Sequence, residues 1–298
     1  MAFRIRADES VAEGLNRLAK KTLQAAHDEL SGQSPPPDQS IHEARKNLKK
    51  ARAILQTIQA ADGGLNLDEE RLRKVSHILS PLRDADAMRQ ILAKLRDQNP
   101  RLFSARTFAR LSRQLASHRR ELLESATRDD AWDKACRRLG RLQLAAEKWK
   151  PSHPQFGALA PGIRISHRNG RQAMARALKR QGAADFHEWR KAIKGLWYQL
   201  RLAEPCGPVV SRDVAALRRA ETWLGDDHNL TVLCDELSEH AVRCEATVDI
   251  DRVRLAADRY GSGLRKKATT AMRTLYERKS GAYVREIKQF WQAQRSRP

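Results

Sequence analysis

The sequence is short of aromatic residues, of cysteine and of long apolar runs. Phe, Trp and Tyr make up only 5% of its 298 residues, which disfavours the stacking surfaces that single-stranded nucleic acids need. The four cysteines, Cys136, Cys206, Cys234 and Cys244, form no Cys-x-x-Cys pair, and we interpret them as reduced thiols. No apolar run of about 18 residues predicts a membrane-spanning helix, and the N-terminal residues lack the apolar core of a secretory signal. We therefore expect a cytoplasmic protein without a membrane partner.

Familiar catalytic motifs are also missing. The sequence contains no Gly-x-x-x-x-Gly-Lys-[Ser/Thr] loop, no Gly-x-Gly-x-x-Gly and no Gly-x-Ser-x-Gly. His42-Glu43 is not followed by the second histidine of a zinc-protease signature. Asp226-Asp227-His228 combines acids with a histidine, but we expect it at a junction between a loop and a helix, and it is weak evidence for a metal. We therefore expect a binding protein that uses no metal or cofactor, rather than an enzyme.

Positive charge is what the sequence has in excess. Lys and Arg number 57 against 36 Asp and Glu, which gives a net charge of +21. Such an excess repels itself in a folded chain, so we expect an anionic partner: nucleic acid, an anionic membrane surface or a phosphate polymer. The charge is spread along the whole chain without a basic tail, which disfavours a tail-type binding arm.

The residue pattern predicts an all-α fold in two halves. Leu, Ala, Arg and Lys dominate, and helical periodicity runs almost from end to end. Pro151–Gly157 and Pro161-Gly162 interrupt it, so we predict a linker at 151–160 between halves 1–150 and 161–298. Each half should hold about six helices of about 12 to 25 residues. Shorter breaks are predicted at Ser31–Ser40, Ala61–Leu67, Asn99-Pro100 and Glu204–Pro208.

One motif occurs twice, 145 residues apart. Ile41–Lys49 and Phe186–Lys194 share His, Glu, Arg, Lys and Lys at identical positions. The same offset aligns Leu72-Arg73-Lys74 with Leu217-Arg218-Arg219 and sets Arg83–Asp86 against His228–Thr231, without a gap. Several matches in one register predict an internal duplication.

On a helix, each copy of the motif separates into an apolar and a basic stripe. The apolar stripes, expected in the core, are Ile41, Ala44, Leu48, Ala51, Leu55 and Ile58, and Phe186, Trp189, Ile193, Leu196 and Leu200. The basic stripes are His42, Arg45, Lys46, Lys49 and Arg52, and His187, Arg190, Lys191 and Lys194. Trp197 replaces the last arginine in the second copy, and we expect Arg201 to restore the charge one turn later.

The basic stripes predict an anion site. A helix face that is merely solvated usually mixes Glu with Lys, whereas we expect no acid on these stripes. His42 and His187 lack further ligands at metal-binding spacing, so we expect each to donate a hydrogen bond to phosphate, and a bound anion would raise its pKa. A solvated basic face, a phosphorylated histidine and a partly buried structural histidine are the alternatives.

Other residues are expected to support or extend this site. Arg83, Asp84 and Asp86 follow Pro81 and should begin a helix, where the acids either favour the helix N-terminus or orient stripe arginines. His228 and Asn229 take their place in the second half, where Asn229 cannot neutralise a charge. Further candidate binding residues on other basic helices are Arg17, Lys20, Lys21, Arg119, Arg168, Arg171 and Lys266.

At these residues the chain resembles the CHAD family, whose pattern is a histidine followed by Arg at +3, Lys or Arg at +7 and Arg at +10, found twice. The first copy fits at His42, Arg45, Lys49 and Arg52, and the second at His187, Arg190 and Lys194, with Trp197 departing. Arg83–Asp86 resembles the family's Arg-Asp-x-Asp motif, and Asn229 departs from its second-half counterpart. The resemblance implies two pseudo-symmetric helical bundles around a basic central groove.

The function that this resemblance implies is the binding of inorganic polyphosphate, together with a place at polyphosphate granules. A phosphate polymer offers charge without bases, which agrees with the abundance of Arg and Lys and the scarcity of aromatic residues. The alternatives are a helical nucleic-acid-binding protein and the regulatory subunit of an enzyme that acts on phosphate polymers.

Overall fold

The computed structural model describes residues 3–204, 207–244 and 250–295, without the side chains of residues 240–244. Across these residues the chain forms α-helices and one short 3₁₀ helix, and no strand occurs among them. The helices are α1 (Val11–Ser31), α2 (Asp38–Asp62), α3 (Asn66–Ile78), α4 (Ser80–Gln98), α5 (Ala105–Arg128), α6 (Ala131–Ala146), the 3₁₀ helix η1 (Phe156–Ala158), α7 (Ala160–Arg180), α8 (Ala183–Leu202), α9 (Pro208–Cys244), α10 (Ile250–Glu277) and α11 (Ser280–Arg295). The predicted all-α class is confirmed.

The predicted helix breaks fall between helices. The main one separates α6 from α7, and only η1 lies within it. The four shorter breaks separate α1 from α2, α2 from α3, α4 from α5 and α8 from α9. The expected helix length of about 12 to 25 residues is wrong for two helices, since α9 has 37 residues and α10 has 28. No helix in the described part of the chain is long and apolar enough to cross a membrane.

Asp226-Asp227-His228 does not lie at a junction between a loop and a helix, as we predicted, because α9 is longer than expected. In the first half a break at Leu79 separates α3 from α4, and Pro81 lies in the first turn of α4, where its ring would obstruct a continuous helix. Asp226 stands 145 residues after Pro81, and an aspartate keeps the backbone N–H that a helix needs. The segment Asp226–His228 therefore lies inside α9 and not at a junction between a loop and a helix.

One helix boundary follows the same 145-residue offset. Asp38 begins α2, and Ala183 begins α8 145 residues later. This correspondence is compatible with the predicted internal duplication.

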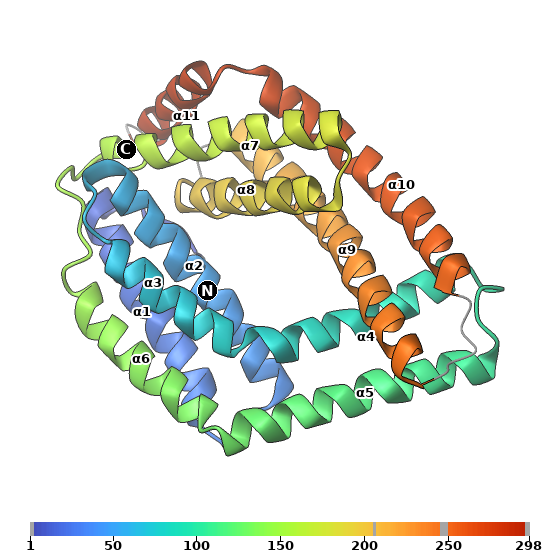
Figure 1. Cartoon of the computed structure of the whole chain (residues 1–298). Coiled ribbons are helices and arrows are strands. Elements are labelled where there is room, and N and C mark those ends of the chain that lie inside the picture. Colours follow the sequence, from blue (N-terminus) through green and yellow to red (C-terminus); the bar gives the residue numbers. More distant parts are fainter. Residues whose placement is uncertain (1–2, 205–206, 245–249, 296–298) are drawn as a thin grey trace.

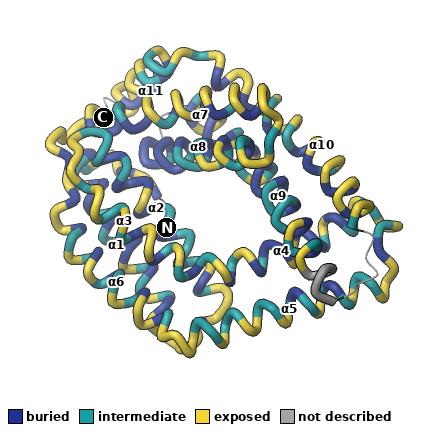
Figure 2. Tube along the Cα trace, in the orientation of Figure 1, coloured by how far each residue is buried: buried dark blue, intermediate teal, exposed yellow. Residues whose placement is uncertain are grey.

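The apolar stripes form the centre of the core. Every stripe residue of α2 and α8 is at most 4% exposed, which confirms the prediction for both helices (Figure 2). A first core cluster joins these helices to α1, α3, α6, α7 and α11, and a second lies among α4, α5, α9 and α10. Helices α9 and α10 contribute to both clusters, so the core does not divide at the linker.

The helices are arranged so that the two motif copies face the middle of the molecule. In Figure 1, α8 lies beside α7, α9 crosses from α8 to α4, and α2, α4, α8 and α9 frame the centre of the view. The first and last described segments are in contact, since the Arg295 guanidinium donates hydrogen bonds to the carbonyl oxygens of Arg6 and Glu9. Near the N-terminus, the Ile5 N–H donates to the Leu202 carbonyl at 3.1 Å.

Two helix-interior glycines give a matched test of this packing. A methyl group at Gly170 of α7 would overlap the buried phenol of Tyr276, whereas nothing lies within 4 Å of the equivalent position at Gly140 of α6. We expect Gly170→Ala to lower the free energy of unfolding by about 1–3 kcal/mol, because the core cannot take the added volume. Gly140→Ala should raise it by up to about 1 kcal/mol. Urea unfolding measures both, and equal effects of the two substitutions would contradict the packing described.

Candidate anion-binding site

The two basic stripes meet in one pocket between α2 and α8. The pocket has a volume of about 410 Å³, and its charged lining residues are Arg45, Lys49 and Arg52 of α2 and Lys191 and Lys194 of α8. Leu48, Ala53, Gln56, Ser76, Gly195 and Tyr198 complete the lining. This central pocket therefore draws charge from both copies of the motif.

Arg45 is held in place by neutral acceptors. Its Nη1 donates hydrogen bonds to the Ser76 carbonyl oxygen at 3.3 Å and to Ser80 Oγ at 3.0 Å. Burial lowers the pKa of Arg45, and the nearby charge of Asp84 offsets this only in part. Because no described residue forms an ion pair with Arg45, its charge is fixed in position without being neutralised.

Arg190, which lies 145 residues after Arg45, has a different partner. Its Nη2 donates to Glu221 Oε1 at 3.0 Å, and both side chains are largely buried. Gly225 of α9 allows this close approach, because a Cβ atom there would lie 3.2 Å from the guanidinium. The same offset relates Glu221 to Ser76, so the carboxylate is present on one side of the site and a serine on the other.

Lys49 and Lys194 carry the least compensated charge. Burial, reinforced by Arg45, lowers the pKa of Lys49 to about 8. Burial, reinforced by Lys49 itself, lowers the pKa of Lys194 to about 7. Glu221 counteracts both shifts, but among the residues that the structure describes none forms a hydrogen bond or ion pair with either ammonium group. The central pocket thus holds more positive charge than its surroundings balance.

The outer edge of each stripe is neutralised by acids, contrary to our expectation that the stripes carry none. Glu43 and Glu188, the third residue of each motif copy, reach Lys46 and Lys191 at 2.6 and 2.5 Å. Arg52 pairs with Glu69 of α3 at 3.0 Å. Lys46, Lys191 and Arg52 therefore have partners, and the excess charge is concentrated at the inner residues.

The motif histidines do not line the central pocket. His187 packs against His228 with 4.0 Å between ring centroids, and burial lowers both pKa values, that of His228 to about 4. Exposed His42 has its pKa lowered by partial burial and by Arg83. All three imidazoles are therefore mainly neutral at pH 7 in the unliganded protein.

The Arg83–Asp86 segment does not begin a helix as predicted, because α4 begins at Ser80 and no acid lies in its first turn. Nor do its acids pair with the stripe arginines. Asp86 accepts a hydrogen bond from Arg119 Nε of α5 at 2.6 Å, and Arg119 also pairs with Asp38. Arg119 therefore links α5 to α2 and α4, and it does not line the central pocket. Asp84 acts on Arg45 through its charge alone. Asn229 forms no side-chain hydrogen bond with any residue that the structure describes.

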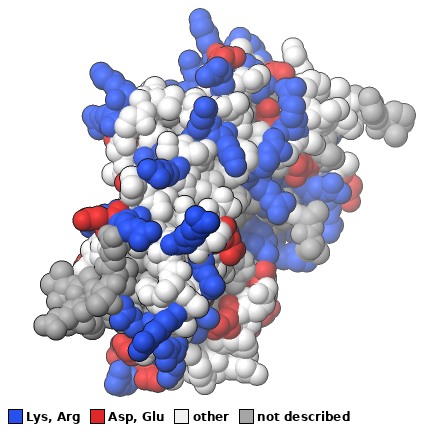
Figure 3. All heavy atoms as spheres, turned by 90° about the vertical axis from the view of Figure 1, so that its right-hand side faces the viewer, with Lys and Arg blue, Asp and Glu red and all other residues white. Residues whose placement is uncertain are grey.

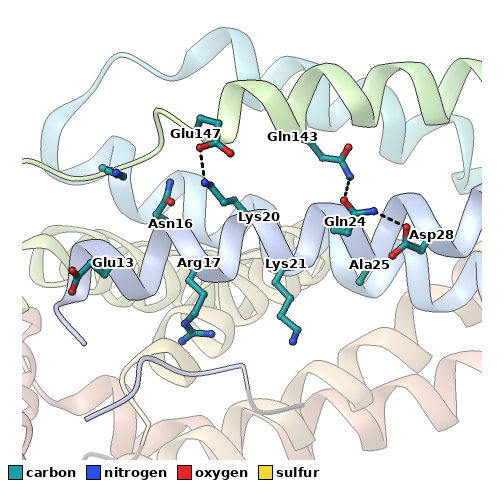
Figure 4. Close-up of a pocket in the computed structure, with 11 residues that line it drawn as sticks. Glu13, Asn16, Arg17, Lys20, Lys21, Gln24, Ala25, Asp28, Gln143 and Glu147 are labelled. Carbon is teal, nitrogen blue, oxygen red and sulfur yellow. Dashed lines mark hydrogen bonds and ion pairs between the residues drawn. The ribbon is translucent and has the colours of Figure 1, made fainter. Parts of the chain in front are cut away.

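The other predicted binding residues lie elsewhere. Arg17, Lys20 and Lys21 line a separate pocket of about 870 Å³ between α1 and α6, which shares no lining residue with the central pocket (Figure 4). Arg17 pairs there with Glu9, and Lys20 pairs with Glu147 at 2.5 Å. The remaining candidates, on α7, α8 and α10, are Arg168, Arg171, Arg201 and Lys266.

Arg168 and Arg171 of α7 and Lys266 of α10 are exposed and line neither of these pockets. Arg201 lies over the rings of Phe3, Trp197 and Tyr198 and is not among the lining residues of the central pocket. Lys and Arg side chains are scattered over the face shown in Figure 3, with Asp and Glu between them. Exposed charge alone therefore does not distinguish a site.

Ser76, Ser80 and Glu221 could not be recognised from the sequence, because a serine aligned with a glutamate forms no recognisable pattern. In the described part of the chain, no three His, Cys, Asp or Glu side chains gather as a metal site. Cys136 and Cys234 are free thiols, and burial raises the pKa of Cys234 to about 11. Cys206 and the side chain of Cys244 lie outside the described residues.

These features define an all-helical protein with a basic pocket between two copies of one motif. The family model of the CHAD domain matches residues 17–238, and the chain belongs to the CHAD domain family. The crystal structure of the CHAD domain from the plant Ricinus communis is similar in fold, with a TM-score of 0.63 and 18% sequence identity. The similarity covers 98% of this chain and 95% of that one. No curated protein matches the sequence significantly.

The two buried lysines predict how stability depends on pH. Their native pKa values lie below the ordinary lysine value of 10.5, so the native state binds fewer protons than the unfolded state between about pH 7 and 10. The free energy of unfolding should therefore contain a contribution that rises with pH across this window. Lys194→Met should reduce that rise and stabilise the protein near pH 6, whereas Lys191→Met should do neither. Urea unfolding at several pH values tests this, and an unchanged pH dependence in Lys194→Met would contradict it.

Proposed function

We propose that the chain binds inorganic polyphosphate, a linear phosphate polymer, in the central pocket between α2 and α8. The single observation that carries this proposal is the presence of two unpaired, largely buried lysines beside two partly buried arginines, of which Arg190 alone pairs with a carboxylate, that of Glu221, among the described residues. Burying like charges together is unfavourable unless an anion occupies the space between them.

The chemistry of the pocket fits phosphate oxygens. Arg45 is already oriented by Ser76 and Ser80, so its free N–H groups can donate to phosphate without reorganising. Lys49 and Lys194 supply charge from the two opposite helices, as a chain with charge on every unit requires. An anion there would restore the ordinary pKa values of both lysines, and binding would become tighter as the pH falls.

We further propose that the role is binding and not catalysis, and that it places the protein at polyphosphate granules. Release of phosphate from polyphosphate in the presence of Mg²⁺ would instead favour an enzyme, or a subunit that regulates one.

The mutational test uses two lysines from different pockets. We expect Lys194→Met to weaken polyphosphate binding about tenfold or more, because it removes a charged contact inside the central pocket. The slope of affinity against salt concentration should fall by about one unit. Lys20→Met, in the pocket between α1 and α6, should change neither. Equal losses in both variants would show that net charge, and not the central pocket, binds the polymer.

Nucleic acid is the competing ligand, and a displacement experiment separates the two. Duplex DNA bound at low salt should be displaced by polyphosphate at equal phosphate concentration, because a flexible linear chain of phosphates can enter a pocket of about 410 Å³ between two helices, whereas a stiff duplex cannot. Persistence of the DNA complex, followed by fluorescence anisotropy, would favour the nucleic-acid alternative.

A further inference from the structure

The central pocket continues into a second pocket between α7 and α8. This second pocket has a volume of about 320 Å³, and it shares Gln56, Lys191 and Gly195 with the central pocket. Helices α7 and α8 lie side by side in Figure 1. On α8, Lys191 and Gly195 are one turn apart and lie between the residues that face α2 and those that face α7. The passage from one pocket to the other therefore crosses α8 at these two residues.

Because Gly195 has no side chain, the surface of α8 is recessed where the two pockets join. Close packing does not require a glycine here, because a Cβ atom at Gly195 would have only Ser166 Oγ near it, at 3.9 Å. The open glycine inside α6 lines neither pocket, whereas Gly195 lines both. Gly162, Gly170 and Gly225 differ, since each is closely approached by another residue. At Gly195, a side chain would instead extend into the space shared by the two pockets.

The first half lacks the equivalent opening. Lys50 stands 145 residues before Gly195, and its side chain fills that position, with Nζ donating to Asn47 at 2.9 Å and lying over the ring of Phe3. The two halves therefore differ at this position, and the opening occurs on the α7 side.

The second pocket is lined by groups that suit a continuing phosphate chain. Ser166, Asn169 and Gln172 of α7 present hydroxyl and amide donors, and Arg176 adds a positive charge. Such uncharged donors commonly contact phosphate oxygens next to basic residues. Glu188 is the one acid among the lining residues, and it is paired with Lys191.

We propose that a phosphate polymer bound in the central pocket extends over Gly195 into the pocket between α7 and α8, which makes this glycine a determinant of selectivity for long chains. The inference rests on the proposed function, since it assigns a second segment of the same ligand. It implies that a short oligomer uses the central pocket alone, while a long chain gains contacts along α7.

The test compares tripolyphosphate with long-chain polyphosphate by calorimetric titration at constant salt. Gly195→Leu changes no charge and places a side chain in the passage. We expect it to weaken long-chain binding about tenfold more than tripolyphosphate binding, because Gly195 lines both pockets and only the long chain must also pass over it. Gly195→Ala, whose methyl group has room, should have a much smaller effect on the long chain than Gly195→Leu. Gly140→Leu, at an open position of α6 that lines neither pocket, is the matched control and should leave both affinities unchanged.

A second variant tests the far pocket directly. Arg176→Ala should reduce the salt dependence of long-chain binding by about one unit and leave that of tripolyphosphate unchanged. Unchanged long-chain affinity in Gly195→Leu, or equal losses for both ligands, would overturn the inference while leaving the proposed function in place. Failure of the wild-type protein to bind either ligand would contradict the proposed function, and the inference with it.

Discussion

Two buried ammonium groups in one pocket are the constraint on which the site depends. Where α2 packs against α8, Lys49 and Lys194 lose much of their water and face the guanidinium groups of Arg45 and Arg190, while Glu221 supplies one carboxylate. Keeping both lysines charged in this environment lowers the stability of the unliganded protein, as the lowered pKa values of both lysines indicate. An anion reverses this effect, so the same arrangement that destabilises the empty pocket favours its occupation.

The rest of the fold keeps these charges together. The apolar stripes of α2 and α8 are fully packed in the first core cluster, so neither helix can turn its basic stripe toward solvent without exposing Leu48 or Trp189. Ser76 and Ser80 hold Arg45 from α3 and α4, and Glu221 holds Arg190 from α9. The charge is thus preorganised by helices from both halves of the chain, which is the condition for binding an anion without a large reorganisation.

Most of what could be predicted about the core and the site rests on the helical periodicity and on the repeated motif. The stripe of Ile41 to Ile58 and its partner on α8 are set by a 3.6-residue period, so the core face and the two halves of the pocket could be read from the sequence. The continuity of α9 was missed because it depends on Asp226 occurring where the first half has Pro81. Two kinds of ion pair were not predicted from the sequence. One links different helices, as in Asp86 with Arg119, and the other joins residues one turn apart on the same helix, as in Glu188 with Lys191. Such contacts depend on rotamers and helix crossings that a stripe pattern does not specify.

Proton uptake on ligand binding tests the central claim most directly. Long-chain polyphosphate, whose internal phosphates stay ionised, would be titrated into the protein at about pH 8 in buffers of different ionisation enthalpy. With Lys194 and Lys49 having pKa values of about 7 and about 8, binding at pH 8 should take up about one and a half protons per site, and Lys194→Met should remove most of this uptake. Tight binding without proton uptake, or with the same uptake in Lys194→Met, would contradict the assignment of the buried lysines as the anion site.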